Sequence, residues 1–146
     1  MKLETQKQRE KNQKENYLGI DFGTKKIGLA LAPRGALALK FLVIPNDKDL
    51  FFKLSQIVEE HAINFVVVGK PLNMDGAESK LGSEVENFVG KLEEIIPTPI
   101  VTYDERFSTG EAKRNLPKEN LEDAEAARII LQGYLDNIQA QNPNIK

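Results

Sequence analysis

The sequence predicts an α/β fold in which a mixed five-stranded sheet is flanked by helices. Extended segments follow one another through short connections near the start of the chain, which is typical of antiparallel hairpins. After them, amphipathic helical patterns alternate with short apolar runs, which is typical of βα units with parallel strands. The sheet is therefore expected to contain three antiparallel hairpin strands followed by two parallel ones.

The hairpin strands come first. The expected strands cover residues 17–22, 27–32 and 36–44. Gly23 begins the turn after the first strand, and Pro33 stops the second, because proline cannot donate to a strand ladder. Such short connections leave no room for a crossover, so these strands should pair as antiparallel neighbours.

Helices and strands then alternate to the end of the chain. The expected order is a helix from 45–47 onward, a strand at 63–69, a helix at 76–96, a strand at 100–103, a short helix from 108 and a last helix at about 121–138. The strand at 63–69 is almost continuously apolar, as in strands covered on both faces. Leu81 belongs to the apolar stripe expected to face the core from the helix at 76–96.

The length of 146 residues fits one domain. Residues 1–16 are charged and almost free of apolar side chains, so we expect a mobile N-terminal tail. The domain should span residues 17–140, followed by a C-terminal tail at 141–146. No secretory signal and no membrane span is evident, so a cytoplasmic location is expected.

Composition excludes several chemistries. The chain has no cysteine and one histidine, which excludes disulfides, thiolate zinc sites, iron–sulfur clusters and cysteine nucleophiles. The formal net charge of −2 is not that of an ordinary nucleic-acid-binding domain, which is usually basic.

Three carboxylates on separate elements are candidates for one site. Asp21 lies within the first strand, Glu105 follows the fifth strand, and Asp123 opens the last helix about 60° from the centre of its core face. Ligands of α/β sheets bind at the carboxyl ends of the strands, so these groups could converge there. Oxygen ligands favour Mg²⁺ or Mn²⁺, and two such ions can assist phosphodiester cleavage.

Simpler structural roles stand beside each candidate. Asp21 is equally compatible with a hydrogen-bonded structural carboxylate, and Asp123 taken alone is more often a helix N-cap. Asp104 is more readily a strand-end cap or a partner of Arg106 than a metal ligand. His61 ends the first helix, where a cation favours the helix dipole, so a catalytic role is not expected.

Four segments together resemble the YqgF/RuvX-type Holliday junction resolvases, a family also described as precursor 16S rRNA nucleases. In chain order, the segments are LGIDFGTKKIGLA (18–30), VGKPLNMDG (68–76), DERFSTGEA (104–112) and DAEAARIILQGYL (123–135). The resemblance implies a ribonuclease H-like fold and a metal-dependent nuclease, with Asp21, Glu105 and Asp123 as catalytic and metal-binding residues.

The loops near these carboxylates carry the expected substrate contacts. The resemblance places the loop that contains Asn73 beside the site, where Asn73 could contact a phosphate or a metal-bound water. Arg106 could pair a carboxylate or a phosphate through its guanidinium group. Thr24, Lys25 and Lys70 complete the expected contacts with the substrate.

The sequence thus favours a two-metal nuclease that processes precursor 16S rRNA, with ribosome-assembly components as further partners. A Holliday junction resolvase acting on four-way DNA is the alternative substrate class. Two other classes stay open: a non-catalytic RNA-binding module on the same fold, and an actin-like ATP-binding fragment, because Asp21-Phe22-Gly23-Thr24 resembles the phosphate loop of those ATPases.

Overall fold

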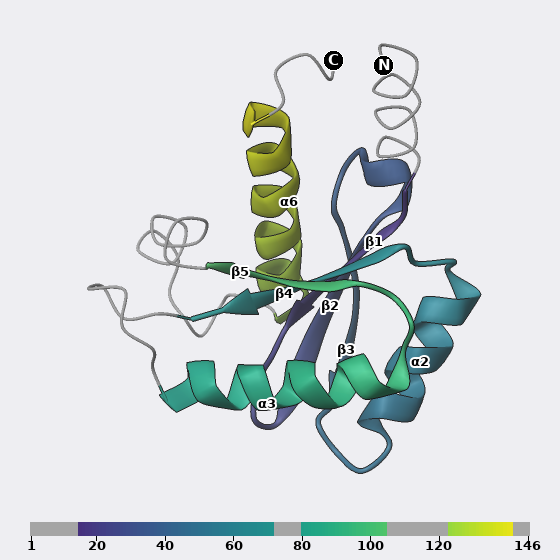
Figure 1. The fold of residues 1–146 in the computed structure, drawn as a ribbon, viewed down its shortest axis with the longest axis vertical. Coiled ribbons are helices and arrows are strands. Elements are labelled where there is room, and N and C mark those ends of the chain that lie inside the picture. Colours follow the sequence, from purple (N-terminus) through teal and green to yellow (C-terminus); the bar gives the residue numbers. More distant parts are fainter. Residues whose placement is uncertain (1–14, 72–79, 105–122, 142–146) are drawn as a thin grey trace.

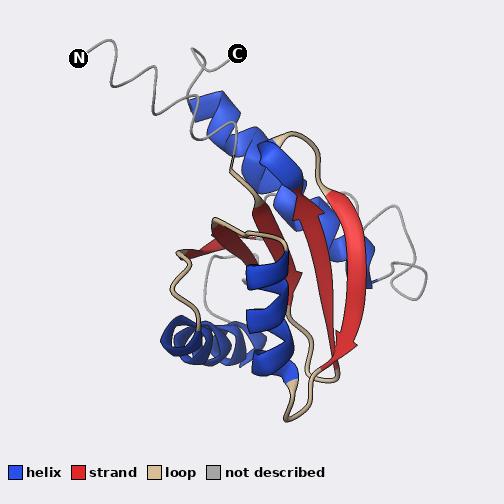
Figure 2. Ribbon diagram, turned by 90° about the vertical axis from the view of Figure 1, so that its right-hand side faces the viewer, coloured by secondary structure: helices blue, strands red, loops and turns tan. Residues whose placement is uncertain are grey.

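The structure, a computed structural model, describes residues 15–71, 80–104 and 123–141. A five-stranded sheet lies between α6 on one face and α2 and α3 on the other (Figures 1 and 2). The strands are β1 (Tyr17–Asp21), β2 (Lys26–Ala32), β3 (Leu39–Pro45), β4 (Phe65–Lys70) and β5 (Ile100–Asp104). The helices are the 3₁₀ turn η1 (Pro33–Gly35), α2 (Leu50–Glu60), α3 (Lys80–Ile95) and α6 (Asp123–Gln141).

The sheet has the predicted mixed topology. Its strand order is β3-β2-β1-β4-β5. β2 pairs antiparallel with both β1 and β3, while β4 is parallel to β1 and to β5. The prediction of three hairpin strands followed by two parallel strands is therefore confirmed.

The sheet separates two apolar cores. The larger core joins alternate residues of the strands to α2 and α3, and its members include Leu18, Ile20, Leu29, Val68, Leu54 and Phe88. The smaller core lies under α6 and is made of smaller side chains on the sheet side, among them Ala30, Ala32 and Val67. Small residues allow α6 to lie close to the strands.

Two expectations about the elements are wrong. The third strand begins at Leu39 rather than at residue 36, because η1 forms first and Arg34 takes a left-handed conformation with φ 60°. Leu81 is 37% exposed rather than buried. The short helix expected from residue 108 lies outside the described residues.

The N-terminal boundary also differs from the expectation. Asn16, assigned above to the mobile tail, is tied to two neighbouring segments. Its backbone N–H donates to Asn64 Oδ1 at 2.8 Å, and its own Oδ1 accepts from the backbone N–H of Arg34 at 2.9 Å. Asn16 therefore belongs to the folded domain.

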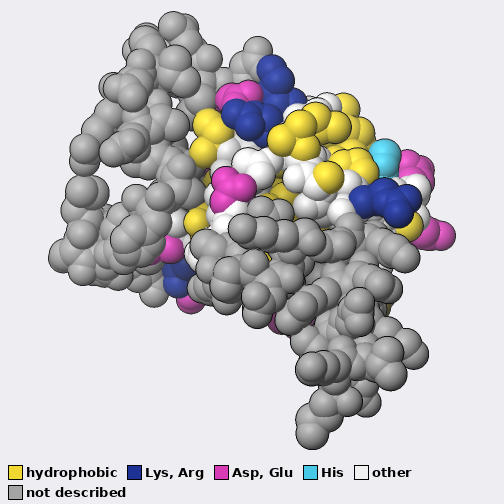
Figure 3. Space-filling view, turned by 90° about the horizontal axis from the view of Figure 1, so that it is seen from above, with side chains coloured by type: hydrophobic (Ala, Val, Ile, Leu, Met, Phe, Trp, Pro, Cys, Tyr) yellow, Lys and Arg dark blue, Asp and Glu magenta, His cyan; other side chains and the backbone are white. Residues whose placement is uncertain are grey.

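β3 forms one edge of the sheet and carries exposed apolar side chains. The exposed large hydrophobic residues in and just before it are Leu37, Leu39, Leu42 and Val43. Viewed from above, described apolar side chains gather in one area of the surface with basic groups on either side (Figure 3). None of the described helices is both long enough and apolar enough to cross a membrane.

Candidate active site

Asp21 is the last residue of β1 and faces α6. The residue two positions earlier, Gly19, lies against Leu131 of α6, and alternate residues of a strand point to the same face. Asp21 therefore shares the α6 face with Gly19, whereas Leu18 and Ile20 fill the core on the opposite face. A half-buried carboxylate at the carboxyl end of a central strand is where the sequence predicted it.

Gly28 brings Asp123 to the same place. Gly28 is the cross-strand partner of Asp21, so the two Cα atoms lie roughly 5 Å apart and share one face of the sheet. A Cβ atom built on Gly28 would lie only 2.0 Å from the backbone oxygen of Asp123. The backbone of Asp123, the first residue of α6, therefore contacts Gly28. Because Gly28 pairs with Asp21, the backbones of the two predicted acidic residues lie near each other.

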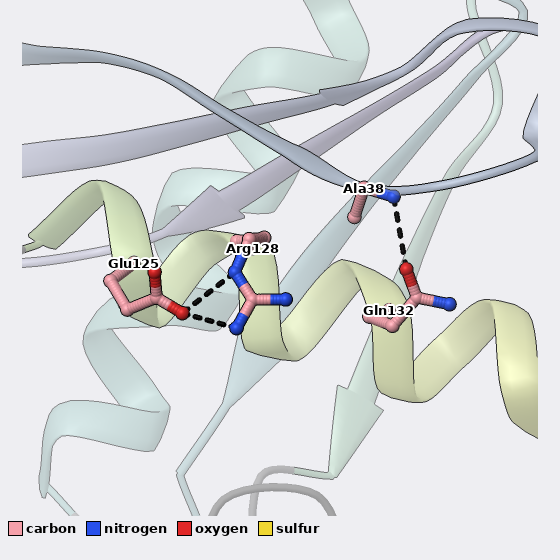
Figure 4. Close-up of polar contacts among 4 residues, drawn as sticks. All are labelled: Ala38, Glu125, Arg128 and Gln132. Atoms are coloured by element: carbon pink, nitrogen blue, oxygen red, sulfur yellow. Dashed lines mark hydrogen bonds and ion pairs between the residues drawn. The ribbon is translucent and has the colours of Figure 1, made fainter.

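Polar contacts fix α6 in this position (Figure 4). Gln132 Oε1 accepts a hydrogen bond of 2.9 Å from the backbone N–H of Ala38, just before β3. At the opposite edge of the sheet, the Tyr103 hydroxyl of β5 donates to the Gly133 carbonyl at 3.2 Å. These bonds join the middle of α6 to both edges of the sheet. They hold the whole helix in place, and with it the position of Asp123 at its start.

An ion pair lies within the first turns of α6. Arg128 Nε donates to Glu125 Oε1 at 2.6 Å, and both side chains are partly buried (Figure 4). This pairing engages Glu125 with a cation of its own helix. Asp123 precedes this pair, and its backbone lies against Gly28.

Asp104 and Lys70 lie on the opposite face of the sheet. They are partners in the parallel pairing of β4 and β5, so their side chains share a face. Lys70 forms an ion pair with Glu86 of α3, which identifies this face as the α3 side. The structure therefore does not bring Lys70 or Asp104 to the α6 face that holds Asp21, and alternation separates Asp104 from any role there.

The loop after β1 holds Thr24 and Lys25. Both residues are exposed, and the loop is fastened to the end of β3, where Asn46 Nδ2 donates to the Gly23 carbonyl at 2.8 Å. A second bond of 2.9 Å runs from the Asn46 backbone N–H to the Lys25 carbonyl. Thr24 lines a cavity on the face of the sheet that α2 and α3 cover, and it follows Asp21 in the loop after β1.

Three predicted site residues, Glu105, Arg106 and Asn73, lie outside the described residues. Within the part of the chain that the structure describes, no group of three metal-ligating side chains occurs. Asp21 and Asp123 are the described residues that could hold a hard divalent cation, because both side chains end in carboxylates and come from elements that meet at Gly28.

His61 lies at the end of α2, as expected from the sequence. It caps the C-terminus of α2, where its backbone N–H donates to Ile57 O at 3.0 Å. Its ring meets Phe41 edge to face with centroids 4.9 Å apart. It lies in another part of the fold from Asp21.

Gly28 is the residue that the sequence interpretation missed. A glycine inside an apolar strand is itself a signal, because it weakens the strand unless another backbone approaches closely. The sequence Ile27-Gly28-Leu29 contains that signal. The neighbouring residues do not indicate, however, that the approaching backbone is that of Asp123.

Comparison with known proteins adds a family. A family model described as RuvX, Holliday junction resolvase, matches residues 15–137. A protein of Desulforamulus reducens named "Putative pre-16S rRNA nuclease" is 39% identical over 132 residues, which cover 82% of this chain and 96% of that protein. A protein of the same name from Buchnera aphidicola is 38% identical and covers 80% of this chain and 93% of its own length.

Solved structures of resolvases share the fold. Thermus thermophilus RuvC in complex with a Holliday junction matches with a TM-score of 0.58 and 13% identity, covering 87% of this chain and 95% of RuvC. The fowlpox virus resolvase bound to junction DNA matches with a TM-score of 0.53 and 12% identity, covering 84% of this chain and 98% of the viral chain. These likenesses confirm the ribonuclease H-like fold.

Proposed function

The chain belongs to the RuvX family, described as Holliday junction resolvases, and we propose that it is a metal-dependent nuclease that processes precursor 16S rRNA. The observation that best supports this proposal is the contact between the backbone of Asp123 and Gly28, which is the cross-strand partner of Asp21. Two carboxylates at the carboxyl end of a central strand are the beginning of an oxygen-ligated metal site.

The proposed metal ligands are Asp21, Asp123 and Glu105, and the proposed ions are two Mg²⁺ or Mn²⁺. Such ions, when bound, activate water for attack and offset charge on the leaving oxygen. Asp21 and Asp123 are held by elements that pack on each other, so they can orient their ligand oxygens without rearrangement.

Glu105 is a better third ligand than its neighbour Asp104. Tyr103 faces α6 and Asp104 faces α3. Asp104 therefore lies on the face away from Asp21, which supports the choice of Glu105 over Asp104.

The remaining proposed contacts are with the substrate. Lys25 and Thr24 lie in the exposed loop that follows Asp21, where they can approach a phosphate. We assign Asn73 and Arg106 the same role on the basis of their motifs, since an amide and a guanidinium both donate to phosphate oxygens. Lys70 would contribute only by exchanging its Glu86 partner for a phosphate.

The names of the relatives favour precursor 16S rRNA as the substrate. We propose that the reaction takes place in the cytoplasm, alongside ribosome-assembly components. The family description favours a second candidate, a four-way DNA junction. Both substrates offer phosphodiester bonds in a structured nucleic acid, so the same carboxylates would serve either reaction.

A cleavage assay with both substrates tests the proposal. Purified protein with Mn²⁺ or Mg²⁺ should cut precursor 16S rRNA, and Asp21→Asn should reduce cleavage by about a hundredfold or more, because the side chain loses the charge that holds the ion. Asp49→Asn, an exposed aspartate before α2, is the matched control and should cut normally.

Other outcomes would select other functions. Preferential cutting of the four-way junction would establish the resolvase alternative. Saturable RNA binding with no metal-dependent cleavage would support the non-catalytic binding module and contradict the proposal.

A further inference from the structure

A cavity of about 300 Å³ lies on the face of the sheet opposite the acidic pair. It is bounded by the loop after β1, the start of α2 and one side of α3, and it is formed around Phe22, Phe51 and Phe88. We call it the phenylalanine pocket. Phe22 directly follows Asp21 in the chain, so this pocket and the candidate metal site lie on either side of the same strand end.

The walls of the pocket are aromatic. The Phe22 and Phe88 rings have centroids 5.0 Å apart, and those of Phe51 and Phe88 are 5.7 Å apart. Phe88 is buried, whereas Phe22 and Phe51 are only half-buried and leave ring surface open to a ligand. Flat aromatic surface of this kind stacks on another planar ring.

The rim of the pocket is polar. Asn87 and Lys91 are four residues apart on α3, so both project from the same side of the helix. Neither side chain has a hydrogen bond or an ion pair with another described residue. The Asn87 amide offers both a donor and an acceptor, and Lys91 offers a positive charge.

This combination matches one class of ligand. A nucleobase presents a flat ring to stack on phenylalanine and donors and acceptors on its edge for an amide, and its phosphate suits an ammonium group. A purely apolar ligand would leave Asn87 and Lys91 without partners. A cation would find Glu84 as the one carboxylate in the lining.

We propose that the phenylalanine pocket binds an unstacked nucleobase of the substrate strand, close to the phosphodiester bond that is cut. This inference rests on the proposed nuclease function. The strand passes over the loop Phe22 to Lys25, with the reacting phosphate on the acidic side and the captured base on the other side. The pocket holds the strand in register by stacking.

Abasic substitution tests the inference with the full chain. A cleavable oligonucleotide is prepared with an abasic nucleotide at each position around the cut in turn. At one position, loss of the base should lower kcat/KM about tenfold. A tenfold loss corresponds to the free energy that stacking of one base contributes. Phe51→Leu, which keeps an apolar side chain but removes the aromatic face, should abolish this penalty at that position.

Matched variants complete the test. Asn87→Ala should also reduce the penalty, whereas Gln56→Ala, an exposed amide on α2 outside the pocket, should retain it in full. An abasic penalty of equal size in the unaltered protein and in Phe51→Leu, or the absence of any sensitive position, overturns the inference.

A binding arm separates this inference from the proposed function. If no substrate is cut, the proposed function fails, and fluorescence anisotropy with Ca²⁺ then measures the binding of a normal and an abasic oligonucleotide. Tighter binding of the normal strand that disappears in Phe51→Leu supports the pocket, and equal binding overturns it. Pocket-centred NMR shifts with free AMP or CMP but none with the oligonucleotide would assign a free nucleotide instead and also overturn the inference.

Discussion

Gly28 allows α6 to begin close to the strand end that holds Asp21, without itself carrying a functional group. Its Cα supports the backbone of Asp123, while its cross-strand partner is Asp21. The closeness of the two acidic residues therefore depends on the absence of a side chain at position 28.

Gly28→Ala is expected to move the start of α6. The added Cβ would overlap the Asp123 backbone oxygen at 2.0 Å, so the helix terminus must shift and carry the carboxylate with it. We expect a loss of about 1–3 kcal/mol in the free energy of unfolding. Cleavage activity should fall on the order of a hundredfold, as for a ligand displaced by about 1 Å.

Chemical denaturation and cleavage rates measure the two effects of Gly28→Ala. A variant that folds normally and cuts at the normal rate would show that the position of Asp123 is unimportant for the reaction. Gly90→Ala is the matched glycine control and should leave cleavage unchanged, because no atom lies within 4 Å of the added methyl group.

Among the elements, α3 contains a glycine with no structural reason visible in its surroundings. Gly90 lies inside the helix and is exposed. Gly90→Ala is therefore expected to stabilise the protein by about 0.5–1 kcal/mol, because alanine has the higher helix propensity and restricts the unfolded chain. Urea titration measures this gain, and a destabilised variant would contradict the assignment of open space around position 90.

Because β1 packs on α6 and buries Tyr17, the stability of the fold is expected to decrease at alkaline pH. Burial, with smaller contributions from Tyr134 and Glu15, raises the pKa of Tyr17 to about 12 from 10. The folded protein thus keeps the Tyr17 proton at a pH where the unfolded chain releases it. Stability from this group is intact below pH 10 and falls as the pH rises from 10 to 12, at roughly 1.4 kcal/mol per unit.

Tyr17→Phe removes this titration. Urea midpoints measured from pH 9 to pH 12 should fall less steeply for Tyr17→Phe than for the unaltered chain. Parallel slopes in the two proteins would show that Tyr17 ionises equally in the folded and unfolded states.

Sequence patterns predicted elements better than contacts. The mixed topology of three hairpin strands and two parallel strands could be predicted because short turns and apolar runs have local causes, and Asp21 could be located because it ends such a run. The boundary at Leu39 could not, since it depends on η1 and on a hydrogen bond from Ala38 to the distant Gln132.

The sequence likewise did not predict which face of the sheet each site residue occupies. Lys70 and Asp104 are next to the right strand ends, yet the register of β4 and β5 turns them toward α3. The backbone of Asp123 lies against Gly28, the cross-strand partner of Asp21, and this contact joins residues far apart in the chain. Glu105, Asn73 and Arg106 remain predictions.

For the molecule as a whole, metal binding should raise thermal stability. The proposed site gathers carboxylates in a chain of net charge −2, and bound divalent cations would offset their negative charge. At Mn²⁺ concentrations about a hundredfold above Kd, linkage predicts about 2.7 kcal/mol, or several degrees in Tm.

Thermal unfolding with and without Mn²⁺ measures this effect. The rise in Tm should be much smaller for Asp21→Asn and unchanged for the exposed control Asp49→Asn. An equal rise in all three proteins would indicate that Mn²⁺ binds elsewhere.

The dependence of the site on α6 has a consequence for the time at which the protein becomes active. Asp21 is translated early and Asp123 about a hundred residues later, and the proposed site needs both residues near Gly28. While α6 is still inside the ribosomal exit tunnel, β1 and β2 can pair but the acidic pair cannot form. A nascent chain would therefore carry no assembled site next to the RNA of the ribosome that makes it, and the site would appear only after release of α6.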